Sequence, residues 1–326
     1  PLRGDFFCLP FGAEHDIGDD EAYSVHGESA VRRWTPGALG ERGRLTSFAM
    51  TMQYQATGGN ITKELILRSG ESVLYSEHTL AGFSGEYPLG HHATLAGSVH
   101  QGELAISVKP FDLGMTNPTE AGYYSDGEYY SLQPGAEFSA LSSVPTIWKK
   151  IPETDISIFP ERKGFVDIAA IFRDQRADQR AEERLAWTCV VNRNQGWIWF
   201  SLKDGALLPA TVFWMENHGR HQAPWDGRNC CLGLEEVCGY LASGRAESIA
   251  KNAVSERGIA TAISLTPERM TPVRYIQGMT SAPEGFERVS ELAPTERGVE
   301  LRDAEGRSVE VEVGWPFLFE GVEALL

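Results

Sequence analysis

Hydrophobic and polar side chains alternate along several short segments of this chain. The clearest is 308–313, where Val309, Val311 and Val313 alternate with Ser308, Glu310 and Glu312. Because successive side chains of a strand point to opposite faces, this alternation predicts a strand with one buried face. The same reasoning predicts further strands at 45–54, 64–68, 72–80, 104–108, 187–191, 197–202 and 211–214.

Turn-forming residues separate these segments, among them Gly58-Gly59-Asn60, Ser69-Gly70, Asn194-Gln195-Gly196 and Asp204-Gly205. Many short strands joined by tight turns are typical of an all-β sandwich or barrel with few helices. No internal repeat and no long linker interrupts the pattern. We therefore expect a single domain over residues 1–326.

Two segments suggest helices. Ala246, Ile249, Ala250, Ala253 and Val254 follow helical spacing and would form one apolar stripe. A helix here would be capped by Ser243 and would end at Gly258. The charged run 173–184 is compatible either with a helix or with a solvated hairpin tip.

The net charge makes some partners improbable. Lys and Arg number 29 against 45 Asp and Glu, so the formal charge is −16, and no basic stripe offsets it. An acidic surface repels phosphate backbones, which argues against a nucleic-acid partner. No window is apolar enough for a membrane helix and no signal segment opens the chain, so we expect a cytoplasmic protein without membrane contact. The chain begins at Pro1 without an initiator Met, which leaves open that N-terminal strands are truncated.

Familiar cofactor and metal motifs are missing. The five cysteines are odd in number and form no C-x-x-C pair, so we expect reduced, mostly buried thiols. Gly85 and Gly90 have the spacing of a phosphate-binding loop, but His91 follows where that loop requires Lys. The acidic cluster Asp16, Asp19, Asp20 and Glu21 lacks the spacing of a calcium loop and is expected to be an exposed loop.

Polar and aromatic side chains concentrate in four segments with glycine corners, at 4–12 with 25–34, at 87–95, at 214–228 and at 232–237. They combine Trp rings, histidines, arginines and carboxylates. The C–H faces of a sugar stack on aromatic rings, and its hydroxyls require planar or charged hydrogen-bonding groups. We therefore expect these glycine-cornered loops to bind a polyol.

Three short motifs, in this order, resemble the galactose mutarotase-like superfamily of aldose 1-epimerases and their relatives. They are His26-Gly27, His92-Ala93-Thr94-Leu95 and Leu232-Gly233-Leu234-Glu235, and the resemblance covers residues 1–290. Glu236 stands where many relatives have Pro. The resemblance implies a β-supersandwich of large antiparallel sheets, in agreement with the strands predicted above.

The resemblance also implies a reaction, the interconversion of the α and β anomers of an aldose. A base removes the proton of the anomeric hydroxyl and an acid protonates the ring oxygen, so the ring opens and recloses. By resemblance Glu235 is the base, His92 is the acid and His26 binds a ring hydroxyl. Neither a metal nor an organic cofactor is required.

Further side chains are candidates for sugar binding. These are Arg220 or Arg228 for a second hydroxyl, Trp214 and Trp225 as stacking platforms, and Glu216 with Asn217 as hydroxyl partners. His91 is not a candidate, because adjacent strand residues face opposite ways and only one of His91 and His92 can enter the site. His218 and His221 are interpreted as rim residues.

Two other classes of function stay open at this point. The chain could be a carbohydrate-binding protein of the same fold without turnover. It could also be a metal-dependent sugar hydrolase or isomerase that uses His26, His91 or His92, and Glu235 as ligands. In each case the partner is a small-molecule sugar, and the sequence is compatible with a homodimer.

Overall fold

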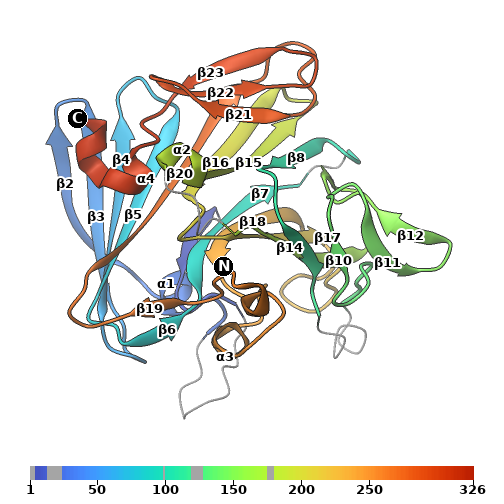
Figure 1. Ribbon diagram of the computed structural model, residues 1–326, viewed down its shortest axis with the longest axis horizontal. Helices are drawn as coiled ribbons and strands as arrows, with labels where there is room; N and C mark the ends of the chain where they lie inside the picture. The colour runs from blue at the N-terminus through green and yellow to red at the C-terminus, as the bar shows by residue number, and fades with distance from the viewer. Residues whose placement is uncertain (1–3, 13–23, 98–99, 119–127, 175–179) are drawn as a thin grey trace.

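Two large antiparallel sheets form the body of the computed structural model, which describes residues 4–12, 24–97, 100–118, 128–174 and 180–326 (Figure 1). The seven-stranded sheet has the order β1-β7-β18-β17-β14-β9-β10. Its strands are β1 Asp5–Cys8, β7 Leu89–Ala96, β18 Cys230–Cys238, β17 Ala210–Asn217, β14 Phe165–Phe172, β9 Leu113–Thr116 and β10 Glu137–Phe138. Strands distant in sequence are thus neighbours at its centre.

The nine-stranded sheet has the order β13-β8-β15-β16-β20-β5-β4-β3-β2. Its strands are β13 Ile158–Phe159, β8 Leu104–Val108, β15 Leu185–Asn192, β16 Trp197–Asp204, β20 Thr271–Ser281, β5 Val73–Ala81, β4 Asn60–Arg68, β3 Leu45–Gln53 and β2 Thr35–Arg42. These bounds confirm the strands predicted from alternation in this part of the chain.

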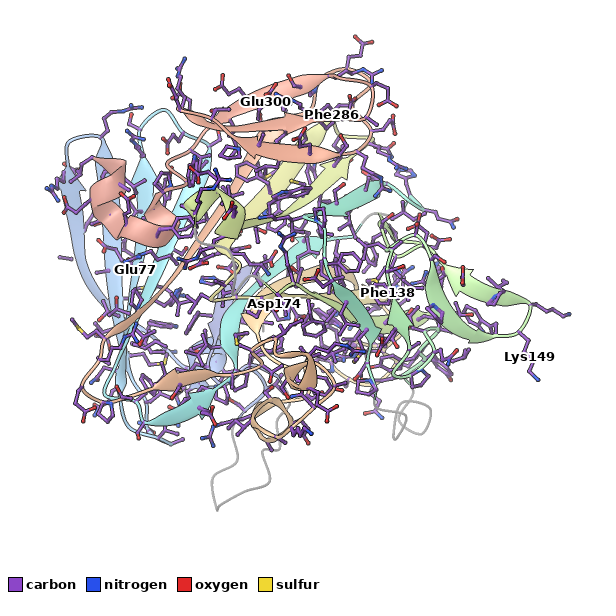
Figure 2. All side chains as sticks on the ribbon, viewed as in Figure 1. Glu77, Phe138, Lys149, Asp174, Phe286 and Glu300 are labelled. Carbon is purple, nitrogen blue, oxygen red and sulfur yellow. The ribbon has the colours of Figure 1, made fainter. Side chains whose placement is uncertain are left out.

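Three small sheets complete the fold. The sheet of β21 Glu291–Pro294, β22 Gly298–Arg302 and β23 Ser308–Glu312 covers one end of the nine-stranded sheet, where Phe286 is buried (Figures 1 and 2). The hairpin of β11 Val144–Trp148 and β12 Ile151–Thr154 projects at the right of the view, with Lys149 at its tip (Figure 2). β6 Gly85–Tyr87 pairs with β19 Ile263–Leu265.

The helices in the described ranges are short: α1 Glu28–Val31, α2 Ala181–Arg184, α3 Arg245–Ile249, α4 Phe317–Glu320, and the 3-10 turns η1 Ser255–Arg257 and η2 Gly321–Leu325. The all-β prediction is therefore confirmed. Within the same ranges, no helix combines the length and the apolar character that a membrane crossing would require.

The two faces of the seven-stranded sheet meet different surroundings. Phe213 and Leu234 point toward the nine-stranded sheet and pack there with Ile106 and Trp199. Their neighbours along the strands, such as Val212, point the other way into a second apolar cluster with Phe11, Leu241, Val254 and Ile259. This outer face carries the candidate site.

The predicted helix over 246–257 is wrong in extent. α3 ends at Ile249, Ala250 is extended, and only η1 follows before Gly258, whose φ is 79°. The Asn252 side chain bonds the backbone N–H groups of Val254 and Ser255 and the carbonyls of Glu247 and Ala250, so it competes with helical hydrogen bonds. The expected Ser243 cap is also wrong, because Gly244 occupies the cap position without a side-chain bond.

Two predictions concern segments only partly described. The charged run 173–184 ends in the four-residue helix α2, and residues 175–179 lie outside the described ranges. The acidic cluster Asp16, Asp19, Asp20 and Glu21 lies wholly outside them.

Candidate active site

His92 and Glu235 lie directly opposite each other on the neighbouring strands β7 and β18. His92 Nε2 is 3.1 Å from Glu235 Oε1, which is a hydrogen-bonding distance. Both residues are almost fully buried, at 3% and 2% exposure. The register of two central strands thus joins two residues that are far apart in the chain.

The segments that carry these groups are strands, whereas the sequence suggested glycine-cornered loops. Residues 89–96 and 230–238 are β7 and β18, in the interior of the sheet. Their glycines, histidines and carboxylates obscure the alternation that marks the other strands. A strand fixes the backbone of a side chain more rigidly than a loop does, which suits a site that must hold an acid and a base in place.

The ring of His92 is held from two other directions. Thr94 Oγ1 lies 3.2 Å from His92 Nδ1, and the ring of Phe6 on β1 stacks on the imidazole at 4.4 Å between centroids. A hydroxyl can donate to a neutral imidazole nitrogen or accept from a protonated one. Thr94 can therefore support His92 in either protonation state.

The second oxygen of Glu235 is unused. Within the described part of the chain, Oε2 of this buried carboxyl has no hydrogen-bond partner. Gly233 lies beside the pair, and an added Cβ there would come within 3.1 Å of Glu235 Oε1, His92 Cε1 and Trp214 Cβ. These contacts are tighter than ordinary van der Waals distances, so the acid–base pair and Trp214 close around a position that only glycine fits.

His26 completes the polar end of the site. Its ring is 5.0 Å from that of His92, nearly perpendicular to it, and its Nδ1 accepts the N–H of Gly12 at 3.4 Å. The proton of the neutral ring is therefore on Nε2, which can donate to a hydroxyl oxygen. Burial, together with the charges of His92 and Arg220, holds the pKa of His26 well below its ordinary value.

Steric contacts explain why a glycine follows His26. His26 has a φ of 62°, and Gly27 has a φ of 77°. A Cβ on Gly27 would lie 1.8 Å from the carbonyl oxygen of Leu9, so only glycine allows this approach to the end of β1. The next residue, Glu28, accepts the backbone N–H groups of Gln55 and Ala56 and therefore holds the turn after β3.

Two tryptophans and an arginine form the other end of the site. Trp214 on β17 makes edge contacts with His92 at 5.9 Å and with Trp225 at 5.5 Å. The guanidinium carbon of Arg220 lies 5.4 Å from the Trp214 ring centre and 5.2 Å from that of Trp225. This is a cation–π arrangement, and it places the charged, planar guanidinium next to the aromatic rings.

Carboxylates surround Arg220. Its Nε is 3.1 Å from Glu128 Oε1 and 3.9 Å from Glu216 Oε2. Glu216 Oε1 accepts the N–H groups of Gly219 and Arg220, at 2.9 and 3.2 Å. Burial raises the pKa of Glu216 above its ordinary value, in opposition to these hydrogen bonds and to the charge of Arg220.

Two other sugar-binding candidates and the two residues interpreted as rim residues lie apart from this group. Asn217 is on the opposite face of β17, where its Oδ1 contacts Cys230 Sγ at 3.7 Å. Arg228 is exposed and paired with Asp226. His218 bonds the carbonyl of Gly227 through Nδ1, and the exposed His221 packs on Tyr129.

The neighbours of the acid–base pair face the nine-stranded sheet. His91 Nδ1 is 2.9 Å from Asp5 Oδ2, and its ring stacks on Tyr275. Glu236 forms an ion pair with Lys203. His91 is therefore outside the candidate site, as strand alternation predicts.

Sequence reasoning did not single out Phe6, Thr94, Gly233 or Glu128 as site residues. A signal existed for two of them. Thr94 follows His92 by two positions and Gly233 precedes Glu235 by two, so once these segments are assigned as strands, alternation places them on the same face. Phe6 and Glu128 depend on pairing with distant segments.

The donor set does not resemble a metal site. Among the described residues, no group of three His, Cys, Asp or Glu side chains is arranged to hold a metal ion. The other imidazole beside the His92–Glu235 pair, that of His26, already accepts a backbone N–H at Nδ1.

Comparison with known proteins identifies the architecture. No protein-family model and no curated protein sequence matches the chain. Among solved structures, a galactose mutarotase-like protein from Lactobacillus casei is 10% identical, with a TM-score of 0.53 over 85% of each chain. A galactose mutarotase-like protein from Clostridium acetobutylicum is 11% identical, with a TM-score of 0.51 over 85% of this chain and 79% of that one.

A third similar structure, from Escherichia coli K12, is described as a "putative aldose 1-epimerase". It is 10% identical, with a TM-score of 0.53 over 85% of this chain and 84% of that one. At such identities the likeness is one of fold, and it agrees with the two large antiparallel sheets described above. The protein therefore has the galactose mutarotase-like fold.

Proposed function

We propose that the protein is an aldose 1-epimerase-like enzyme that interconverts sugar anomers by acid–base ring opening. The observation that carries this proposal is the buried His92–Glu235 pair, with one carboxylate oxygen left without a partner among the described residues. Similarity of fold to a protein described as a "putative aldose 1-epimerase" is consistent with it.

The close contact of the two groups suits the reaction. The anomeric hydroxyl oxygen and the ring oxygen are both bonded to the anomeric carbon, so the base and the acid that serve them must lie side by side. Glu235 Oε2 would accept the hydroxyl proton. His92, acting in its protonated form, would turn its Nε2–H from Glu235 Oε1 to the ring oxygen and would be left as a neutral imidazole. Ring opening, rotation about the adjacent bond and reclosure then give the other anomer.

The surrounding groups have supporting roles in this proposal. Thr94 keeps His92 oriented through both protonation states. His26, neutral and carrying its proton on Nε2, donates to a ring hydroxyl, and Arg220 is positioned to bind another. Gly233 carries no side chain between the pair and Trp214, where an added Cβ would crowd both. These two proton transfers need neither a metal nor an organic cofactor.

The test is anomer exchange measured by NMR on a panel of aldoses, with and without protein. An enzyme accelerates exchange of at least one sugar above the buffer rate, and Glu235→Gln lowers turnover by about 10²–10⁴-fold, the usual contribution of a general acid or base. Glu41→Gln, a matched change on the exposed edge strand β2, is the control and should keep full turnover.

The rival function, sugar binding without catalysis, gives the opposite pattern. The parent protein would then bind a sugar in calorimetry but leave its anomer exchange at the buffer rate, and Glu235→Gln would alter affinity alone. An active parent whose Glu235→Gln variant keeps full turnover would instead disprove the assignment of the base.

A further inference from the structure

The candidate site is buried at one end and exposed to solvent at the other. His92 and Glu235 are buried, and beyond them the outer face is closed by the apolar cluster that includes Phe11 and Val254. In the other direction exposure rises: Trp214 is the only partly exposed residue of β17, and Ala96 at the end of β7 is exposed. A ligand whose reacting atoms reach the pair must therefore extend outward over Gly233 and Trp214.

Polar atoms without hydrogen-bond partners lie along this path. Trp214 Nε1 and Glu216 Oε2 are buried and, like Glu235 Oε2, have no hydrogen-bond partner in the ranges that the structure describes. Glu216 Oε2 has only the more distant Arg220 Nε, at 3.9 Å. All three side chains lie on the outer face, since Glu235, Gly233 and Cys231 pair in turn with Val212, Trp214 and Glu216. The order is acceptor, donor, acceptor.

The length of this array decides what it can hold. From Val212, opposite Glu235, to Glu216 the strand advances about 13 Å, at about 3.3 Å per residue. A single pyranose ring at the acid–base pair cannot reach across this distance. Buried polar groups are normally paired, so atoms left unpaired at the far end point to a ligand that continues there.

The far end also has the chemistry of a sugar subsite. Trp225 is half-buried against Trp214 in an otherwise exposed segment, 221–226, next to Arg220. Aromatic rings bordered by a guanidinium and carboxylates suit the C–H faces and hydroxyls of a neutral pyranose. Glu128 and Glu216 already offset the charge of Arg220, so this end offers no net positive charge to a phosphorylated sugar.

We propose that the site has a second sugar subsite, formed by Trp214, Glu216, Arg220 and Trp225, and that the substrate is the reducing end of a neutral disaccharide or longer oligosaccharide. The inference rests on the proposed function. The reducing sugar occupies the closed end at His92 and Glu235, and the next sugar lies over the tryptophans toward the opening.

The test compares kcat/KM for anomer exchange of maltose, cellobiose and lactose with that of D-glucose and D-galactose. At least one disaccharide should be favoured about tenfold or more, since 1.4 kcal/mol of added binding is tenfold. Trp225→Leu should lower the disaccharide value about tenfold more than the monosaccharide value, mainly through KM. Glu216→Gln, which keeps an acceptor for the Gly219 N–H, should reduce the same preference. The matched control is Trp197→Leu, on β16 of the other sheet, which should leave the preference unchanged.

The outcomes separate this proposal from the previous one. Equal kcat/KM values for both sugar sizes, with Trp225→Leu lowering both alike, would overturn the second subsite and leave the epimerase proposal standing. If no sugar is turned over, the epimerase proposal fails and the subsite is judged by calorimetric binding of maltose and glucose. Tighter binding of maltose, lost in Trp225→Leu, would support the subsite, and equal binding would overturn it.

Discussion

The two faces of the seven-stranded sheet differ although neighbouring residues of the same strands supply them. On the outer face His92 bonds Glu235, and one oxygen of that carboxylate has no partner among the described residues. On the inner face Glu236 is paired with Lys203 and accepts hydroxyl hydrogen bonds from Thr188, Ser201 and Thr211, at 2.6, 3.0 and 2.7 Å.

Hydrogen-bond partners distinguish a structural carboxylate from a candidate base in this sheet. Glu236 is saturated, and although burial acts to raise its pKa, the Lys203 charge and the hydrogen bonds hold it below the ordinary value. A fully paired carboxylate has no lone pair to offer a substrate. Glu235, equally buried, keeps one oxygen, Oε2, without a partner among the described residues.

The largest expected effect is on turnover, and it tests whether the outer pair acts as one unit. We expect Glu235→Gln and His92→Asn each to lower kcat by about 10²–10⁴-fold. The double variant should lose less than the product of the two losses, because groups that act together are not additive. Anomer exchange by NMR measures all three proteins. Multiplicative losses would contradict a coupled pair.

The next effect is on stability and concerns the inner face. Glu236→Gln keeps the size of the side chain but leaves the buried Lys203 ammonium without its countercharge. Removing one partner of a buried ion pair costs about 3–5 kcal/mol. Urea unfolding followed by circular dichroism should show this loss for Glu236→Gln. Glu235→Gln, the matched change on the outer face, should cost less than about 1.5 kcal/mol. Equal losses of unfolding free energy in the two variants would contradict the proposed difference between the two carboxylates.

A third effect is the pH dependence of stability. Burial, with the charges of His91 and Lys63, holds the pKa of His78 well below 6.5. The unfolded chain therefore binds this proton first, and the associated stability is present above about pH 6.5 and lost as the pH falls toward the folded pKa. The slope is up to about 1.4 kcal/mol per pH unit for each such group.

Replacing His78 tests this linkage. Its ring stacks on Phe7 at 4.2 Å between centroids, so His78→Phe keeps an aromatic ring in place. Urea unfolding between pH 7.5 and 5.5 should show a smaller slope for the variant, while the contribution of His26 persists. Glu236 acts in a separate window, since its lowered pKa confines its loss of stability to below about pH 4.5. An unchanged slope would show that His78 is not the linked group.

The smallest effect concerns Thr94. Thr94→Val removes the hydroxyl at His92 Nδ1 but keeps the branched shape, and loss of one hydrogen bond costs about 0.5–1.5 kcal/mol. We expect kcat to fall by about 2- to 12-fold and the pH dependence of kcat to shift. Thr94→Ser should restore both the value of kcat and its pH dependence. A variant that changes KM alone would indicate that Thr94 contacts substrate and does not position His92.

Much of the fold could be predicted from alternation, and the failures have physical causes. The strands β3, β8, β16 and β23 carry clear patterns and were predicted close to their observed bounds. β7 and β18 were interpreted as loops, because both of their faces are covered and their polar residues break the pattern. The helix predicted after Arg245 ends early because Asn252 bonds the local backbone, an effect that apolar spacing does not reveal.

Once residues 89–96 and 230–238 are assigned as strands, the sequence alone determines which side chains share a face: His92 with Thr94, Glu235 with Gly233, and His91 and Glu236 on the other side, because the period of a strand is two. It did not determine that Glu235 pairs with His92. That contact is a matter of register between strands far apart in the chain, and a shift by one residue would reverse which face each side chain occupies. Only the tertiary packing of both faces selects the register, and with it the acid–base pair.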